Sequence, residues 1–325
     1  MKKFLKLLYT TLASLLILGT FTACSKEANN SSMKIDTSEI MDGMHTLYAG
    51  NTHGYSFGFD TKPSYTVDED GIFELYSSTD TMYFSVESAG DDNSQLAVQF
   101  FIDYVQAPII IDGVTYDTFF IDANEKFSQE YAFQFANKID TSKNHKILGI
   151  LTAYSNVLIA TQDVVASGND SICIDGILSF AKNNSLVEPQ YNISEPLELY
   201  EDMFSGVLLN TEKKNIRKIP QKLVSAIPEE TIHLKYHIGD DGGKESFVLL
   251  INIANRQAKI NGQYYYYCST SSNKIAYGDI TIQAPKEPGM YEITAWSIPE
   301  PFSANISNTN TIVPMAMRFT LQVEE

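Results

Sequence analysis

Cysteine, tryptophan and basic charge are all scarce in this chain of 325 residues. Its three cysteines, Cys24, Cys173 and Cys268, are too few and too widely spaced for a disulfide framework. The formal net charge is −17, and residues 24–200 hold 26 acids against 8 lysines, a net charge of −18. Residues 201–325 hold 14 acids against 12 cations. Such a surface repels polyanions, so a nucleic-acid partner is excluded.

The sequence also lacks the short motifs of common cofactor and metal enzymes. It contains no P-loop, no G-x-G-x-x-G after a strand, no C-x-x-C, no H-E-x-x-H and no internal repeat. We therefore expect no cofactor and no metal centre, and a protein that is not an enzyme. Carboxylates are plentiful, but sequence alone cannot pair any two of them as an acid and a base.

The first residues have the organisation of an export signal. Lys2, Lys3 and Lys6 precede an uncharged apolar run over residues 7–23, slightly shorter than the roughly 20 residues of a membrane-spanning helix. The run ends in Phe21-Thr22-Ala23-Cys24, which resembles the lipobox of bacterial lipoproteins, although that family prefers leucine where Phe21 stands. The resemblance implies removal of residues 1–23 and acylation of Cys24. The alternatives are a secretory signal with a stray cysteine and an uncleaved anchor.

Composition divides the rest of the chain into a tether, two domains and a linker. Residues 24–44 are polar and predict a flexible tether with a reach of about 20 to 25 Å. Residues 184–203 contain two prolines and little periodicity, which is typical of a linker. We therefore expect one domain over residues 45–183 and a second over residues 204–325.

Residues 45–183 predict an α+β domain with an antiparallel sheet flanked by helices. Apolar residues spaced three and four apart favour a helix over residues 94–106, and a second helix is expected to begin near residues 167–170 and to end at about 182. Alternating patterns predict strands over the following ranges: 54–59, 72–77, 82–88, 114–121, 125–135, 146–154 and 157–162.

This order of elements resembles the PsbP-like domains of bacterial lipoproteins. The resemblance is carried by Gly54-Tyr55-Ser56-Phe57, by VDEDGIF over residues 67–73, and by Ile177-Leu178-Ser179-Phe180. Members of that family share no catalytic constellation, so the resemblance implies no functional residue here.

Residues 204–325 predict an all-β domain. Strands are expected over six ranges: 231–238, 246–254, 263–268, 276–284, 290–296 and 315–323. The stretch Pro288-Gly289-Met290-Tyr291 resembles the entry into a late strand of bacterial Ig-like domains. The number and length of the strands suit an Ig-like β-sandwich.

Two motifs that could carry chemistry are better explained as strands. Residues 54–58 match G-x-S-x-G, but the serine elbow of hydrolases needs a strand before Ser56 and a helix after it, whereas the alternation of apolar residues indicates a strand. His233 and His237 are four residues apart, which is about 13 Å along a strand and too far for one metal ion. We expect both histidines on the solvent face.

Two further groups are candidates for binding. Asp68 and Asp70 lie in one acidic turn and Asp240 and Asp241 in another, and either turn is a possible calcium ligand set or ordinary turn chemistry. Residues 263–268 read Gln-Tyr-Tyr-Tyr-Tyr-Cys, and alternation places Cys268 on the core face. We therefore expect Tyr265 and Tyr267 on the exposed face, as a contact platform or as ordinary strand aromatics.

Taken together, the sequence predicts a non-enzymatic lipoprotein anchored through lipid on Cys24 at the extracytoplasmic face of the cell membrane. Its role would be to bind a protein or a small ligand at the cell surface. Two alternatives stay open. One is an exported hydrolase of the cell envelope that uses acidic residues or Ser56, and the other is a calcium-stabilised adhesive module.

Overall fold

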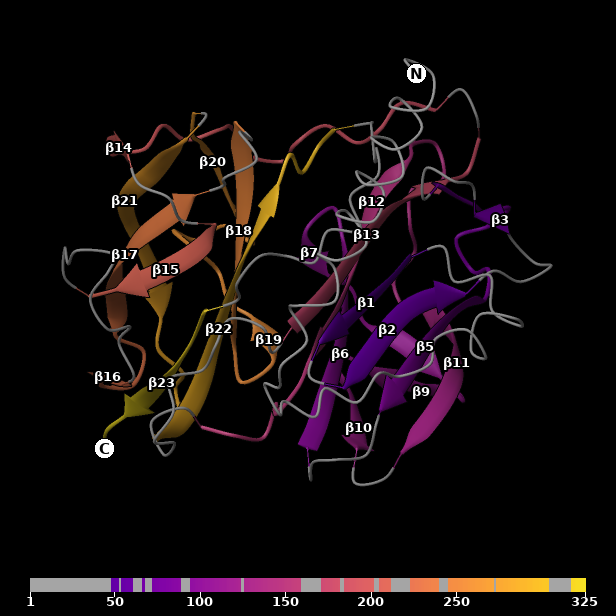
Figure 1. Cartoon of the computed structure of the whole chain (residues 1–325), viewed down its shortest axis with the longest axis horizontal. Helices are drawn as coiled ribbons and strands as arrows, with labels where there is room; N and C mark the ends of the chain where they lie inside the picture. Colours follow the sequence, from indigo (N-terminus) through magenta and orange to yellow (C-terminus); the bar gives the residue numbers. More distant parts are fainter. Residues whose placement is uncertain are drawn as a thin grey trace, which may run out of the picture. The chain divides into compact units, whose positions relative to one another are not determined.

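The computed structural model contains one compact unit over residues 44–325, and every regular element in the described residues is a β-strand (Figure 1). The predicted signal and the predicted tether up to residue 44 lie outside the described residues. These comprise 48–52, 54–60, 66–67, 72–88, 94–123, 126–158, 171–181, 184–201, 205–211, 223–239, 245–271, 273–303 and 317–325.

The first half of the unit forms two sheets that share an aromatic core. The first outer sheet has the order β1 (Tyr48–Thr52), β2 (Tyr55–Asp60), β5 (Met82–Ser88), β11 (Phe127–Phe135), β8 (Ile109–Ile111) and β9 (Val114–Tyr116). The first inner sheet has the order β10 (Phe119–Ala123), β6 (Ser94–Ile102), β12 (His145–Thr152), β13 (Ser171–Ser179), β4 (Ile72–Glu74) and β3 (Thr66–Val67), with β7 (Val105–Gln106) beside β6. Between them the Phe100 and Phe133 rings stack with centroids 4.6 Å apart.

The second half forms another two sheets. The second inner sheet has the order β16 (Leu223–Ala226), β23 (Met317–Val323), β22 (Gly289–Pro299), β18 (Ser246–Ile253) and β19 (Arg256–Gln257), with β20 (Tyr266–Ser269) beside β18. The second outer sheet has the order β14 (Glu198–Glu201), β21 (Lys274–Gln283), β17 (Thr231–Gly239) and β15 (Gly206–Asn210).

The second half has an Ig-like strand arrangement. In chain order, β15, β17, β18, β21, β22 and β23 correspond to strands A, B, C, E, F and G of an Ig-like sandwich. The A, B and E equivalents lie in one sheet and the C, F and G equivalents in the other. The Ig-like sandwich expected over residues 204–325 is therefore confirmed.

The two inner sheets pack against each other and form a third core. Along β12, Ile147 and Leu151 point into the first core, whereas Leu148 and Ile150 point toward the second half of the chain. They meet Val248, Leu250, Trp296 and Ile298 from β18 and β22. Both faces of each inner sheet are therefore buried.

This double burial explains why the expected α+β class is wrong. The helix expected over residues 94–106 is β6 followed by β7, and the second expected helix is β13. Leu96 and Phe100 point into the first core, while Phe101 points into the third core. A strand that is apolar on both faces places apolar residues at spacings of three and four as well as two, which imitates a helix. The PsbP-like resemblance loses its basis with these helices.

Most of the expected strands are confirmed. The residues over 82–88 form β5 with the expected limits. Eight further strands begin and end within three residues of their expected limits: β2, β11, β12, β17, β18, β21, β22 and β23. The expected strand over 157–162 lies outside the described residues from residue 159 on. The boundary between the two domains stays a prediction.

We expect Phe101→Ala to lower the free energy of unfolding by about 3 to 5 kcal/mol, because it empties part of the third core. Phe120→Ala, on the neighbouring strand β10, is the matched control, since that ring is 46 % exposed; it should cost about 0.5 kcal/mol. Urea unfolding followed by circular dichroism measures both. Equal effects of the two variants would contradict burial of both faces of β6.

Candidate functional site

Ser56 lies inside a strand and not at a strand-to-helix turn. It is on β2, opposite Asn51 of β1 and Glu87 of β5, and its neighbours Tyr55 and Phe57 are buried in the first core. The strand interpretation of G-x-S-x-G is therefore confirmed. Nothing in this geometry presents the Ser56 hydroxyl as a nucleophile.

Tyr265 is buried in the third core, and Tyr267 is partly buried against it. Tyr265 is 1 % exposed, its hydroxyl accepts a hydrogen bond from the Gln190 backbone N–H at 2.8 Å, and its ring lies 5.8 Å from that of Tyr104. Tyr267 packs against Phe302 with ring centroids 5.3 Å apart. The predicted alternation is right, but the expected exposure of Tyr265 is wrong, because the first inner sheet packs against that face.

The two histidines, His233 and His237, lie in different environments. His233 is exposed as expected, but His237 is buried. Its Nδ1 lies 2.7 Å from the Tyr200 hydroxyl and its ring packs on Tyr277. The expected solvent exposure of His237 is therefore wrong.

Cys24, Asp68, Asp70, Asp240 and Asp241 lie outside the described residues. Within the described part of the chain, no three His, Cys, Asp or Glu side chains gather as a metal site. No helix there is long and apolar enough to cross a membrane.

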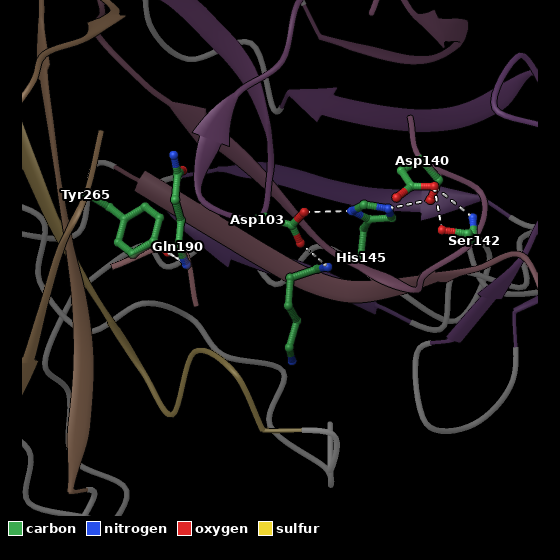
Figure 2. Close-up of polar contacts among 7 residues, drawn as sticks. Asp103, Asp140, Ser142, His145, Gln190 and Tyr265 are labelled. Atoms are coloured by element: carbon green, nitrogen blue, oxygen red, sulfur yellow. Dashed lines mark hydrogen bonds and ion pairs between the residues drawn. The ribbon is translucent and has the colours of Figure 1, made fainter. Parts of the chain in front are cut away.

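A group of hydrogen-bonded polar residues lies around His145, at the start of β12 (Figure 2). Its Nδ1 is 2.6 Å from Asp103 Oδ2, and its Nε2 is 2.8 Å from the Asp140 backbone carbonyl oxygen. Asp103 Oδ1 also accepts the Lys146 backbone N–H at 3.0 Å. Ser142 donates its own N–H and hydroxyl to the Asp140 carboxylate.

This geometry favours a doubly protonated imidazole. A carbonyl oxygen and a carboxylate only accept hydrogen bonds, so both ring nitrogens of His145 act as donors. Burial opposes the charge, but the hydrogen bonds to Asp103 and to the Asp140 carbonyl outweigh it, and the pKa of His145 is raised from its ordinary value. Because neither nitrogen is available to take a proton from a substrate, this histidine is not arranged as a general base.

Asp103 belongs to a tight turn that reaches into the third core. Asp103 and Tyr104 have φ angles of 50° and 66°, a left-handed pair that forms the two-residue hairpin between β6 and β7. The Tyr104 hydroxyl donates to the Pro301 carbonyl, and the Tyr104 carbonyl accepts the Gln257 side-chain N–H at 2.7 Å. His145 therefore holds the turn that links the two halves of the unit.

A buried lysine and a partly buried carboxylate lie near this turn. Lys146 Nζ is 4.0 Å from Asp175 Oδ2. Burial lowers the pKa of Lys146 and raises the pKa of Asp175, so both move toward neutrality. Burial also raises the pKa of Cys173, and that of Cys268 to about 12. Both cysteines are buried and free, and a thiol in this state is unreactive.

A buried arginine joins the halves at a second place. Arg318 of β23 forms an ion pair with Glu292 of β22 at 3.2 Å. The same guanidinium donates to the carbonyl oxygens of Ala153 at 3.2 Å, Tyr154 at 3.0 Å and Val157 at 2.9 Å, all in the first half. The charge is thus satisfied by Glu292 of the second inner sheet and by the turn that follows β12 of the first.

Amides complete the junction. Gln106 and Gln257 exchange hydrogen bonds, each side-chain oxygen accepting the other's backbone N–H at 2.7 Å. Asn252 donates to Gln99 at 2.7 Å, and Gln99 donates to the Asn255 carbonyl at 2.7 Å. These hydrogen bonds join the two inner sheets, which also pack against each other.

Comparison with known proteins finds no matching family and no matching curated protein. Among solved structures, the CARDB domain of a Pyrococcus furiosus protein in complex with di-metal ions has a TM-score of 0.26 and 14 % identity, over 42 % of this chain and 94 % of that one. The calcium binding domain CBD12 of CALX1.1 has a TM-score of 0.20 and 8 % identity, over 75 % and 93 %. Such low scores support no conclusion about activity or partner.

We expect the stability of the protein to depend on the charge of His145. Its folded-state pKa is raised, so the stability it contributes is fully present below its unfolded pKa of about 6.5 and is lost as pH rises through the folded pKa. Urea midpoints from about pH 5.5 to about pH 8.5 should fall more steeply for the native protein than for His145→Gln. The exposed His233→Gln is the control and should follow the native curve. Parallel curves for all three proteins would show that His145 is not held as an imidazolium.

We also expect Arg318→Met to lower the free energy of unfolding by about 3 to 5 kcal/mol, since it leaves Glu292 buried without its cation. The exposed pair of Arg256 and Asp117, 3.8 Å apart, supplies the matched control. Arg256→Met should change stability by about 0.5 kcal/mol or less. A similar small effect of both substitutions, measured by urea unfolding, would contradict the role of Arg318 in the junction.

Proposed function

We propose that this chain is a lipid-anchored binding protein on the extracytoplasmic face of the cell membrane and that it acts without catalysis. The anchoring part is supported by the lysines, the uncharged run and Cys24 at its end. The binding part is supported by the all-β unit with its Ig-like second half. Outer sheet faces, sheet edges and loops are the surfaces through which such a unit makes contacts.

The observation that carries the proposal is the third core between the inner sheets. Interfaces between domains that move are usually modest in area and polar. Here Trp296, Tyr104 and Phe101 are buried in the third core, and the buried Arg318 donates hydrogen bonds to the turn that follows β12. The two halves are therefore packed and hydrogen-bonded to each other, which suits a protein that presents a fixed surface to a partner.

The contacts of His145 and Asp103 support the proposal of a role without catalysis. Both ring nitrogens of His145 are engaged by acceptors, and Asp103 is engaged by His145 and by the backbone of Lys146. These contacts stabilise a turn of the scaffold and leave no proton to exchange with a substrate.

We expect Cys24→Ala to release the protein from the membrane fraction and to block removal of residues 1–23. Ser25→Ala is the matched control at the neighbouring position and should stay in the membrane. Ultracentrifugal fractionation and mass spectrometry of the N-terminal peptide measure anchoring and processing separately. Membrane retention and unchanged processing of Cys24→Ala would refute the lipid anchor.

Protease treatment of intact cells tests the orientation. The described unit should be degraded only after a protease is given access to the extracytoplasmic side. Degradation only after the cytoplasm is opened would refute the proposed location.

A further inference from the structure

The segment over residues 193–201, here called the strap, holds a large share of the exposed apolar side chains in the described residues. The structure has ten large exposed apolar side chains in its described residues, and three of them lie in this stretch. Ile193 is 43 % exposed, Leu197 is 70 % exposed and Leu199 is 39 % exposed. Single exposed apolar residues are ordinary, but a cluster of this kind marks an interaction site.

The strap is fixed in place by backbone hydrogen bonds. The Ser194 N–H donates to the Tyr267 carbonyl at 2.8 Å, and the Leu197 N–H donates to the Tyr277 carbonyl at 2.9 Å. Its last four residues form β14, which pairs with β21 and is the end strand of the second outer sheet in the described residues. Leu197 and Leu199 are therefore displayed at the edge of the second outer sheet, whereas Ile193 precedes the pairing of Ser194 with β20 of the second inner sheet.

Acidic residues alternate with these apolar side chains. Glu195, Glu198 and Glu201 are all exposed. The stretch contains no cation, and residues 24–200 as a whole have a net charge of −18. Two copies of this edge would bring glutamates next to glutamates, which opposes self-pairing. An oppositely charged partner meets no such repulsion.

We propose that the strap binds an extended segment of a partner protein in which apolar residues alternate with lysine or arginine. The partner's apolar side chains cover Leu197 and Leu199 on one face of this edge, and its cations lie on the opposite face, against Glu198. Addition of a strand to a sheet edge is an established mode of peptide recognition, and charge pattern supplies the choice of partner. This inference rests on the proposed binding function and names the chemistry of its partner.

Fluorescence anisotropy of a labelled peptide tests the proposal. The full chain, purified in detergent, is titrated into KVKVKVK or into the acidic peptide EVEVEVE as the charge control. We expect KVKVKVK to bind, EVEVEVE not to bind, and affinity for KVKVKVK to fall between about 50 mM and about 300 mM salt. Equal binding of the two peptides, or binding of neither, would overturn the proposal.

Two variants locate the binding site. The double substitution Leu197→Asn with Leu199→Asn removes the apolar side chains, and Glu198→Gln with Glu201→Gln removes the charge; each should weaken KVKVKVK binding about tenfold. The matched control is Leu223→Asn with Ile227→Asn. Leu223 lies in β16, the end strand of the second inner sheet, and Ile227 follows that strand; their side chains are 40 % and 59 % exposed. Unchanged affinity in the strap variants would place binding elsewhere and overturn the inference.

Sedimentation of the full chain tests whether the strap binds a second copy of the protein. We expect no dimer that depends on the strap. A dimer that the Leu197→Asn, Leu199→Asn variant abolishes would mean that the strap binds a second copy, which would overturn the proposed partner. A negative peptide result with Cys24-dependent membrane retention would refute this inference alone and leave the proposed anchoring intact.

Discussion

Burial of the two inner sheets against each other is the constraint on which the rest of the structure depends. Each inner sheet covers the core of its own half with one face and contributes to the third core with the other. Apolar side chains such as Trp296 supply the stabilisation, and Arg318, Gln99 and Gln257 satisfy the polar groups that this burial would otherwise leave without water. The junction therefore combines apolar burial with a dense set of hydrogen bonds.

The same constraint explains which features the sequence could predict. The first half of β17 has one buried face, alternates clearly and is predictable from pattern alone. Strands β6 and β13 are buried on both faces, and their patterns lose the period of two. The sequence predicts the wrong environment for Tyr265 for a related reason. Alternation identifies two faces of a strand but does not reveal that a second sheet covers one of them.

The polar group around His145 had no signal in the sequence. Asp103, Asp140 and His145 are separated by up to 42 residues, and a two-residue turn without glycine brings Asp103 to the start of β12. Arg318 and the carbonyl at Ala153 are 165 residues apart. Such contacts depend on the packing of two sheets, which a one-dimensional pattern does not encode. The charge asymmetry, in contrast, is a property of composition and follows directly from the sequence.

In the proposed function, this all-β unit with an acidic and apolar strap on one sheet edge acts as a binding protein. Its two inner sheets bury each other, and Trp296, the single tryptophan of the chain, lies in that junction. Acrylamide quenching of the native fluorescence tests this most directly. The account predicts blue-shifted emission and weak quenching until the whole protein unfolds. Emission and quenching typical of a solvated indole in the native protein would contradict it.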